Sequence, residues 1–294
     1  MKRELNEAFE IRVSGTEDWY AMTVPGSAMD TLVKEGVLPD PYYGENEYEV
    51  REFFRNDFDI RGHFTISPEE FSSEHLLLIF HGIDTVADLY LNGHKLGHTE
   101  NMHRRFPFSI KEWAKEGENL LELHLASPLK FIEDYKPEKG REIHMCNTGT
   151  MPGNQYLRKP HCMFGWDWGP QLPDAGIFRK IELVTYEKAR LLDTLIRQKH
   201  EEGQVTLTMT TDVEKDADAK VTLTYEVLDP DGKLLYLGSD PVVKIDEPRL
   251  WWPHGNGEQP LYTVRVIMES EGESAQEKLY RIGLRTVTVS REDD

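Results

Sequence analysis

The chain has 294 residues, of which 38% are hydrophobic and 30% charged, and its formal net charge at pH 7 is −19. A surface this acidic repels phosphate groups, which excludes nucleic acid as a partner and disfavours anionic membranes. No apolar run of about 18 residues is present, so no membrane span is expected. The first segment, MKRELNEAFEIRV, lacks the apolar stretch of a signal peptide, and only two cysteines occur. We therefore expect a cytosolic protein without a disulfide framework.

Few segments predict helices, and each of these is short. In SAMDTLVKEG, Ser27 and Asp30 have the spacing of an N-terminal capping pair, and Gly36 can end the helix. In SPLKFIEDY, Ser127 can cap a helix whose first position is Pro128. The pattern is not the regular alternation of strands and helices that a parallel α/β fold requires.

Strand signals dominate the first two thirds of the chain. HLLLIF, residues 75–80, is the continuous apolar run of a strand that is covered on both faces. Asn92-Gly93 lies between two extended segments, and both residues tolerate positive φ, so a hairpin is predicted there. The segment NLLELHLAS alternates, so one face of a strand should carry three leucines: Leu121, Leu123 and Leu125.

Beyond about residue 186 the sequence changes to alternating strands with acidic turns. The segments VTLTMTT, KVTLTYEVLD and LYTVRVIME show period-two alternation. In DPDG, Asp229–Gly232, proline presets φ and glycine can take the left-handed conformation of a turn. Because about 105 residues of such strands suit a small β-sandwich, we place a domain boundary near residues 186–192.

The sequence contains few signals of a catalytic or cofactor site. It has no G-x-S-x-G nucleophile motif, no phosphate-binding loop and no dinucleotide fingerprint. His144, Cys146, His161 and Cys162 are soft metal ligands by type, but their spacing matches no zinc template. A pairing of His161 with Cys162 as a nucleophile is disfavoured, since sequence neighbours rarely form such a dyad. We expect no cofactor and no metal.

The segment FGWDWGP, residues 164–170, has two interpretations. Trp166 and Trp168 could be core residues, with Asp167 in a turn, or the segment could be a sugar platform. In the second case the indole faces would contact a sugar ring and the carboxylate would accept bonds from its hydroxyls. The residues alone leave both interpretations open. LWWPHGNG, residues 250–257, raises the same question, and there we favour packing and a turn at a domain edge.

Several segments together resemble the β-mannosidases of glycoside hydrolase family 2. They are VPGSAMDTLVKEGVLPDPYYGENE, FHGIDTVADLYLNGHKLG, ENMHRRFPFSI with EGENLLELHLASPL, RKPHCMFGWDWGPQLPDAGIFRKIEL, and LWWPHGNGEQPLYTV with RIGLRTV. They follow the family's order and span essentially the whole chain. The segment that contains FGWDWGP is the most specific of them.

The resemblance implies an all-β fold class. Residues 1–188 should form a jelly-roll, galactose-binding-like β-sandwich, and residues 189–294 an immunoglobulin-like β-sandwich. In the family a catalytic (β/α)₈ barrel of about 250 residues follows, and this chain stops near its expected start. Because the family's acid/base and nucleophile are glutamates on that barrel, no catalytic residue is expected in this chain.

The resemblance also implies a role for the tryptophan segment. The longer protein should be an exo-acting retaining β-mannosidase, with a β-mannoside as its carbohydrate partner and the barrel as a partner in the same polypeptide. In such enzymes the corresponding loop reaches the sugar pocket. Asp167 would then bind mannose hydroxyls, Trp166 would line the pocket and Trp168 would be buried support.

The sequence leaves three alternatives open. The chain could be a stand-alone carbohydrate-binding module. It could belong to another activity of the family, such as exo-β-glucosaminidase, β-galactosidase or β-glucuronidase. Finally, its two domains could serve to shape oligomer contacts.

Overall fold

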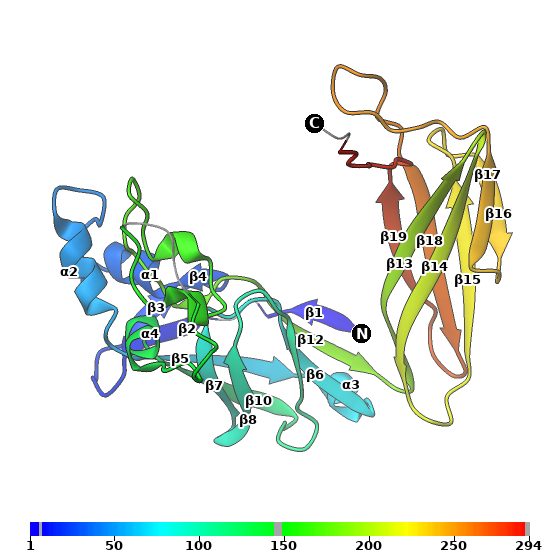
Figure 1. Cartoon of the computed structure of the whole chain (residues 1–294). Helices are drawn as coiled ribbons and strands as arrows, with labels where there is room; N and C mark the ends of the chain where they lie inside the picture. Colours follow the sequence, from blue (N-terminus) through cyan, green and yellow to red (C-terminus); the bar gives the residue numbers. More distant parts are fainter. Residues whose placement is uncertain (6–7, 144–148, 292–294) are drawn as a thin grey trace. The chain divides into compact units, whose positions relative to one another are not determined.

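The computed structural model describes residues 1–5, 8–143 and 149–291. The chain divides into two compact units, Met1–Thr185 and Tyr186–Asp294 (Figure 1). Each unit has its own hydrophobic core. The predicted boundary at residues 188/189 lies three residues beyond this division. Of the helices in the described part of the chain, none is both long and apolar enough to cross a membrane.

The first unit contains two main sheets and a short third one. Their strand orders are β1-β12-β6-β9, β3-β2-β5-β10-β7-β8 and β11-β4, and the paired strands are antiparallel. The strands are β1 (Lys2–Glu4), β2 (Phe9–Val13), β3 (Tyr20–Met22), β4 (Gly26–Ser27), β5 (Phe58–Ile66), β6 (His75–Phe80), β7 (Val86–Leu91), β8 (His94–Glu100), β9 (Phe106–Ser109), β10 (Gly117–Leu125), β11 (Gly176–Ile177) and β12 (Ile181–Tyr186).

Period-two alternation builds the core of this unit. On β10, Leu121, Leu123 and Leu125 are buried, as the sequence predicted, while the residues between them are partly exposed. On β6, Leu76, Leu77 and Leu78 are all buried, which confirms coverage of both faces in the middle of that strand.

The predicted hairpin is present between β7 and β8. Asn92 and Gly93 both have positive φ, 51° and 82°, which is the conformation that a two-residue turn between twisted strands demands. Asn92 also donates a hydrogen bond of 2.8 Å to the carbonyl of Trp113. The turn is therefore fixed both by its backbone and by a side-chain contact.

Short helices lie between the strands of the first unit. Ser27 accepts a hydrogen bond from the Asp30 amide at 3.2 Å, and Ser127 accepts one from Lys130, so both predicted caps are confirmed. A complete capping box occurs elsewhere, between Ser67 and Glu70. The helices are α1 (Ala28–Lys34), α2 (Asn46–Phe53), α3 (Pro68–Ser72), α4 (Pro128–Asp134) and two 3₁₀ turns, η1 (Asn154–Tyr156) and η2 (His161–Met163).

The second unit is a β-sandwich of a three-stranded and a four-stranded sheet, as the sequence predicted. The strand orders are β13-β14-β17 and β16-β15-β18-β19. Gly232 has a φ of 84° and donates to the Asp229 carbonyl at 3.0 Å, which confirms the DPDG turn. The strands are β13 (Ala189–Glu201), β14 (Gln204–Lys215), β15 (Val221–Leu228), β16 (Leu234–Gly238), β17 (Val242–Asp246), β18 (Tyr262–Ser270) and β19 (Gln276–Ile282).

Candidate carbohydrate site

The FGWDWGP segment forms a tight hairpin whose tip is Asp167-Trp168. The Trp166 amide donates to the Gly169 carbonyl at 3.3 Å, and the Gly169 amide donates back to Trp166 at 3.4 Å. Below the tip, Phe164 pairs with Gln171 in an antiparallel bridge. Phe164 is fully buried in the core of the first unit. The hairpin therefore stands on an apolar anchor at its base.

Two glycines allow a neighbouring segment to lie directly against this hairpin. Gly165 has a φ of +94°, and a Cβ there would come within 2.7 Å of the Gly149 carbonyl oxygen. A Cβ on Gly149, whose φ is +81°, would come within 2.8 Å of the Trp166 carbonyl oxygen. Any larger residue at either position would force the two backbones apart.

Gln171 ties the hairpin to helix α2. Its backbone amide donates to Glu47 Oε1 at 2.7 Å, and its side-chain oxygen accepts a hydrogen bond from the guanidinium of Arg51. Its side-chain nitrogen donates to the Gly149 carbonyl at 2.9 Å. Glu47 and Arg51 are four residues apart, so they lie on one face of α2. The tip is thus positioned by a polar network at its base.

A buried ion pair supports the segment that carries the hairpin. Lys159, on the chain that leads into it, pairs with Asp84, and both side chains are almost entirely inaccessible to water. Lys159 also donates to the Asp174 carbonyl at 2.9 Å. Burial raises the pKa of Asp174, whose side-chain oxygen accepts from the backbone amides of Met29 and Ala175. These contacts join both ends of the hairpin segment to the sandwich.

Both tryptophans of the hairpin are exposed. Trp166 is 41% exposed and Trp168 is 83% exposed, and their ring centroids are 6.3 Å apart with planes at 44°. The interpretation that both rings lie in the core is therefore wrong, and Phe164 holds the core position instead. The expectation that Trp168 is buried support is also wrong for this chain, because the turn places it at the tip. A platform requires such accessible indole faces.

Asp167 is exposed between the two indoles. Its carboxylate makes no hydrogen bond or ion pair with the residues that the structure describes. The two carboxylate oxygens are therefore free to accept bonds from the hydroxyls of a ligand. The sequence places Trp166, Asp167 and Trp168 side by side, and the hairpin keeps all three accessible at one tip.

Three tyrosines in and just before helix α2 were not singled out as site residues from the sequence. Tyr42, Tyr43 and Tyr48 are 80%, 77% and 56% exposed. Tyr48 lies on α2, next in sequence to Glu47, and the guanidinium of Arg51 lies 5.2 Å from its ring centroid. Such a concentration of exposed rings in DPYYGENEY is unusual for a solvated surface. This composition is the signal by which the sequence could have indicated them.

The tryptophan pair of the second unit has a different setting. Trp251 is partly buried, its amide donates to the Leu284 carbonyl at 3.0 Å, and the Arg285 guanidinium lies 4.4 Å from its ring centroid. Packing, as predicted, therefore describes Trp251. Trp252 is 50% exposed, and Gly257 packs closely against its ring.

The residues considered for metal binding are only partly described. His144 and Cys146 lie outside the described residues. Cys162 is a free, exposed thiol next to His161. Within the ranges 1–5, 8–143 and 149–291, no three His, Cys, Asp or Glu residues are grouped closely enough to hold a metal ion.

Comparison with known proteins places this architecture in a family. Residues 9–179 match the family described as the glycosyl hydrolase 2 galactose-binding domain-like family, and residues 189–285 match glycosyl hydrolases family 2. The chain belongs to glycosyl hydrolase family 2. Its two units are thus the jelly-roll and immunoglobulin-like sandwiches that the sequence predicted.

Individual members of the family extend the comparison. The chain is 28% identical to a β-mannosidase of Bos taurus over 291 residues, which cover 92% of this chain and 33% of that protein. A β-mannosidase B of Emericella nidulans is 28% identical over 309 residues, or 99% and 36% of the two chains. This family 2 chain therefore spans about a third of the length of these curated relatives.

Solved structures share this fold. The β-D-mannosidase of Dictyoglomus thermophilum superimposes with a TM-score of 0.86 at 30% identity, over 98% of this chain and 36% of that one. The exo-chitosanase CsxA of Amycolatopsis orientalis gives a TM-score of 0.68 at 19% identity, over 98% and 34% of the chains. This second likeness shows a shared fold alone.

Proposed function

We propose that this chain is the non-catalytic N-terminal part of an exo-acting, retaining β-mannosidase that removes terminal β-D-mannose. Two curated relatives that match 92% and 99% of this chain are named β-mannosidase and β-mannosidase B. The observation that carries the proposal for this chain is the exposed Trp166-Asp167-Trp168 tip on a rigid base. By itself the chain would not hydrolyse a mannoside, because the two carboxylates of the reaction would come from a barrel in the same polypeptide.

In this proposal the hairpin completes a sugar pocket that the barrel begins. Asp167 would accept paired hydrogen bonds from two mannose hydroxyls, and these charged bonds are stronger than neutral ones. Trp166 would present its indole face to the C–H bonds of the sugar ring. Trp168, which is the more exposed of the two, would bury its ring against either the sugar or the barrel.

The first measurement is the mass of the polypeptide in its source. This chain has a mass of 34.1 kDa. A source polypeptide that is heavier by at least the mass of a barrel, which has about 250 residues, would support the proposal. The longer chain should then hydrolyse aryl β-mannosides. A mass near 34 kDa would contradict it.

The second test replaces the carboxylate in the longer polypeptide. Asp167→Ala and Asp167→Asn should lower kcat/KM for an aryl β-mannoside more than tenfold. A tenfold loss corresponds to about 1.4 kcal/mol of transition-state stabilisation. Asp18→Ala is the matched control, because Asp18 is exposed and also precedes a tryptophan. A loss below tenfold in the Asp167 variants would show that the hairpin does not hold the substrate.

A stand-alone carbohydrate-binding module is the second candidate, and the exposed indole faces favour it as well. Titration of the 294-residue chain with mannose and manno-oligosaccharides separates the two. A self-sufficient module should bind with a Kd of about 1 mM or better, whereas half of a pocket should not. The low cysteine content supports a cytosolic location for either protein, which cell fractionation can test.

A further inference from the structure

A cavity of about 810 Å³ in the first unit involves none of the Trp166–Gly169 hairpin residues. It is lined by residues of the segments 135–143 and 155–161, together with His103. Its volume falls within the range of about 300–1,000 Å³ that is usual for small-molecule sites. The cavity is therefore large enough to hold an oligosaccharide, and it is much larger than a single inorganic ion.

Specific contacts build the walls of this cavity. The Ile143 amide donates to the Tyr156 hydroxyl at 3.0 Å, and the Gln155 side chain donates to the Ile143 carbonyl at 3.0 Å. The rings of Tyr135 and Tyr156 stack with centroids 4.8 Å apart and planes at 25°. The Met102 amide donates to the Arg158 carbonyl at 2.9 Å. The two lining segments are thus held together and held to the end of β8.

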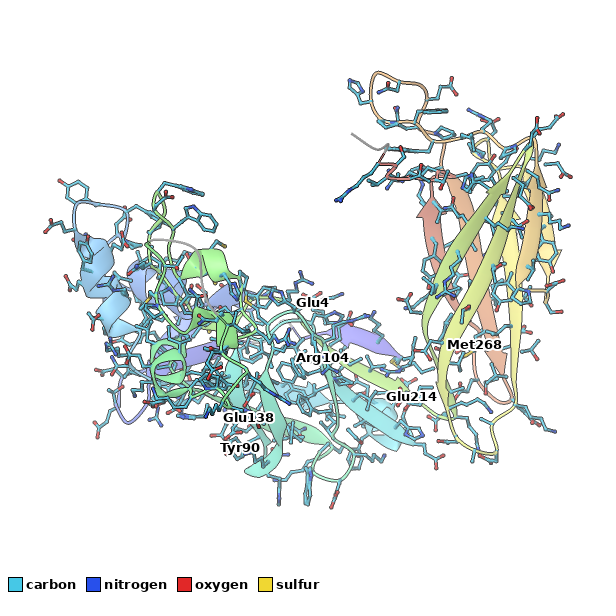
Figure 2. All side chains as sticks on the ribbon, viewed as in Figure 1. Glu4, Tyr90, Arg104, Glu138, Glu214 and Met268 are labelled. Carbon is cyan, nitrogen blue, oxygen red and sulfur yellow. The ribbon has the colours of Figure 1, made fainter. Side chains whose placement is uncertain are left out.

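The charge of the lining is opposite to that of the whole protein. The chain carries −19, yet the cavity lining contains four permanent cations and one acid, Glu138. One of these cations, Lys159, is already paired with the buried Asp84, which leaves Lys136, Arg141 and Arg158. Glu138 is labelled in Figure 2, on the segment that follows α4. It pairs with Arg141 at 3.2 Å, but both side chains are more than three quarters exposed, so water screens this pair strongly.

Arg158 is the strongest candidate for contact with a ligand. It is exposed, and its guanidinium makes no hydrogen bond or ion pair with the described residues. Gln155 adds a second group, because its side-chain nitrogen has two N–H donors and gives only one of them, to the Ile143 carbonyl, among the described residues. A guanidinium binds carboxylate or phosphate through paired N–H bonds, and an amide N–H can donate to a hydroxyl oxygen.

We propose that this cavity binds a saccharide that carries a carboxylate or a phosphate group. Arg158 and Arg141 would bind the anionic group, and the second N–H of Gln155 Nε2 would donate to a sugar hydroxyl oxygen. The ring of Tyr135 stacks on Phe131 and Tyr156 but is 43% exposed, so its edge offers apolar contact to the sugar. This site does not depend on the mannosidase proposal, because it uses different residues.

Calorimetric titration of the 294-residue chain tests the site with matched pairs of ligands. One pair is digalacturonate and neutral galactobiose, and the other is mannose 6-phosphate and mannose. At least one acidic member should bind at least tenfold more tightly than its neutral partner, and the one that does identifies the anion. Equal affinity within both pairs, or no binding below about 10 mM, would overturn the proposal. Equally tight binding of inorganic phosphate or of a glutamate-rich peptide would overturn it too.

Variants locate the binding. Arg158→Gln and Arg141→Gln should each weaken the acidic saccharide at least fivefold, and Tyr135→Ala should weaken it while the preference for acid persists. Arg281→Gln is the matched control, because Arg281 is an exposed arginine on β19 of the second unit. It should leave affinity within twofold of the original. Circular dichroism shows whether each variant is folded, and unchanged affinity in both folded arginine variants would refute the site.

Discussion

Two tryptophan pairs, one in each unit, show how similar residues can reach different settings. FGWDWGP and LWWPHGNG both combine two tryptophans with glycine and proline. In the first, the tip carries Trp166 and Trp168 into solvent, and the buried ring belongs to Phe164. In the second, Trp251 packs beside Arg285, and its amide donates a hydrogen bond to the carbonyl of Leu284, two residues after β19.

The difference lies in what holds each segment. The hairpin of the first unit is fixed at its base by Gln171, Glu47 and Arg51, so its rings need not contribute to packing. In the second unit Trp251 is itself part of the packing. A ring that is not needed for stability is available for binding. The two segments therefore differ in whether a tryptophan ring is packed, although their compositions are similar.

The largest expected effect concerns the buried support of the hairpin. Lys159→Met should lower the free energy of unfolding of the first unit by about 3–5 kcal/mol, because it leaves Asp84 as an unpaired buried charge. Hydrogen exchange, recorded separately for the amides of each unit, measures the free energy of unfolding of the first unit. Lys34→Met removes the exposed ion pair with Asp30 and should cost no more than about 0.5 kcal/mol. Equal effects of the two variants would show that the buried pair does not support the unit.

Trp251→Ala should have the next largest effect, on the second unit. Loss of a partly buried indole should lower the free energy of unfolding by about 2 kcal/mol. Trp252→Ala, in the same segment, should cost less than about 1 kcal/mol. Hydrogen exchange of β18 and β19, recorded at increasing denaturant concentration, measures the change in free energy of unfolding for both variants. A reversed order would mean that Trp252 is the packed ring.

Acid should weaken the first unit through Glu182 on β12. Burial alone would raise its pKa, but hydrogen bonds from Lys180, His81 and Lys2 bring the pKa of Glu182 to about 2 from an ordinary 4.5. The stabilisation is complete above about pH 4.5 and is lost as the pH falls toward 2. Since the two lysines are well exposed, solvent screening reduces the expected loss to about 1–2 kcal/mol.

Stability measured between pH 5 and pH 2 checks this expectation. Glu182→Gln should flatten the decline in the first unit and leave the second unit unchanged. An identical decline in the variant would assign the acid sensitivity to other carboxylates, such as Glu70, whose pKa is also lowered.

The smallest expected effect on stability belongs to the hairpin tip. Trp168→Ala should change the free energy of unfolding by less than about 0.5 kcal/mol, because the ring is 83% exposed. It should also remove fluorescence that acrylamide quenches readily, whereas Trp251→Ala should remove mainly fluorescence that is quenched poorly. A cost above 2 kcal/mol for Trp168→Ala, in contrast, would show that the ring packs against the protein.

Local patterns predicted much of the fold. The alternation of Leu121, Leu123 and Leu125, the Asn92-Gly93 turn and the Ser27 and Ser127 caps are each decided by a few neighbouring residues. Helix α2 was not predicted, because no side chain caps its first turn and its apolar stripe is weak. It is held instead by contacts such as that between Glu47 and Gln171, which are 124 residues apart in the sequence.

For the candidate site, the sequence by itself determined which groups are close together. Trp166, Asp167 and Trp168 are neighbours whatever the fold, and the two glycines beside them allow a sharp turn. The family resemblance was likewise present in the order of the motifs. Whether the rings were core or surface could not follow from these residues, because an indole suits either environment.

Only the tertiary structure decided the exposure of the rings and the charge of the second cavity. Lys159 pairs with Asp84 across 75 residues, and this pair places the hairpin segment on the sandwich so that Phe164 rather than Trp168 enters the core. The cavity gathers Arg141, Arg158 and His103 from separate segments of a chain whose net charge is strongly negative. Composition and local pattern contain no information about such long-range contacts. The exposure of the indole rings and the positive charge of the cavity lining are therefore set only when the chain folds.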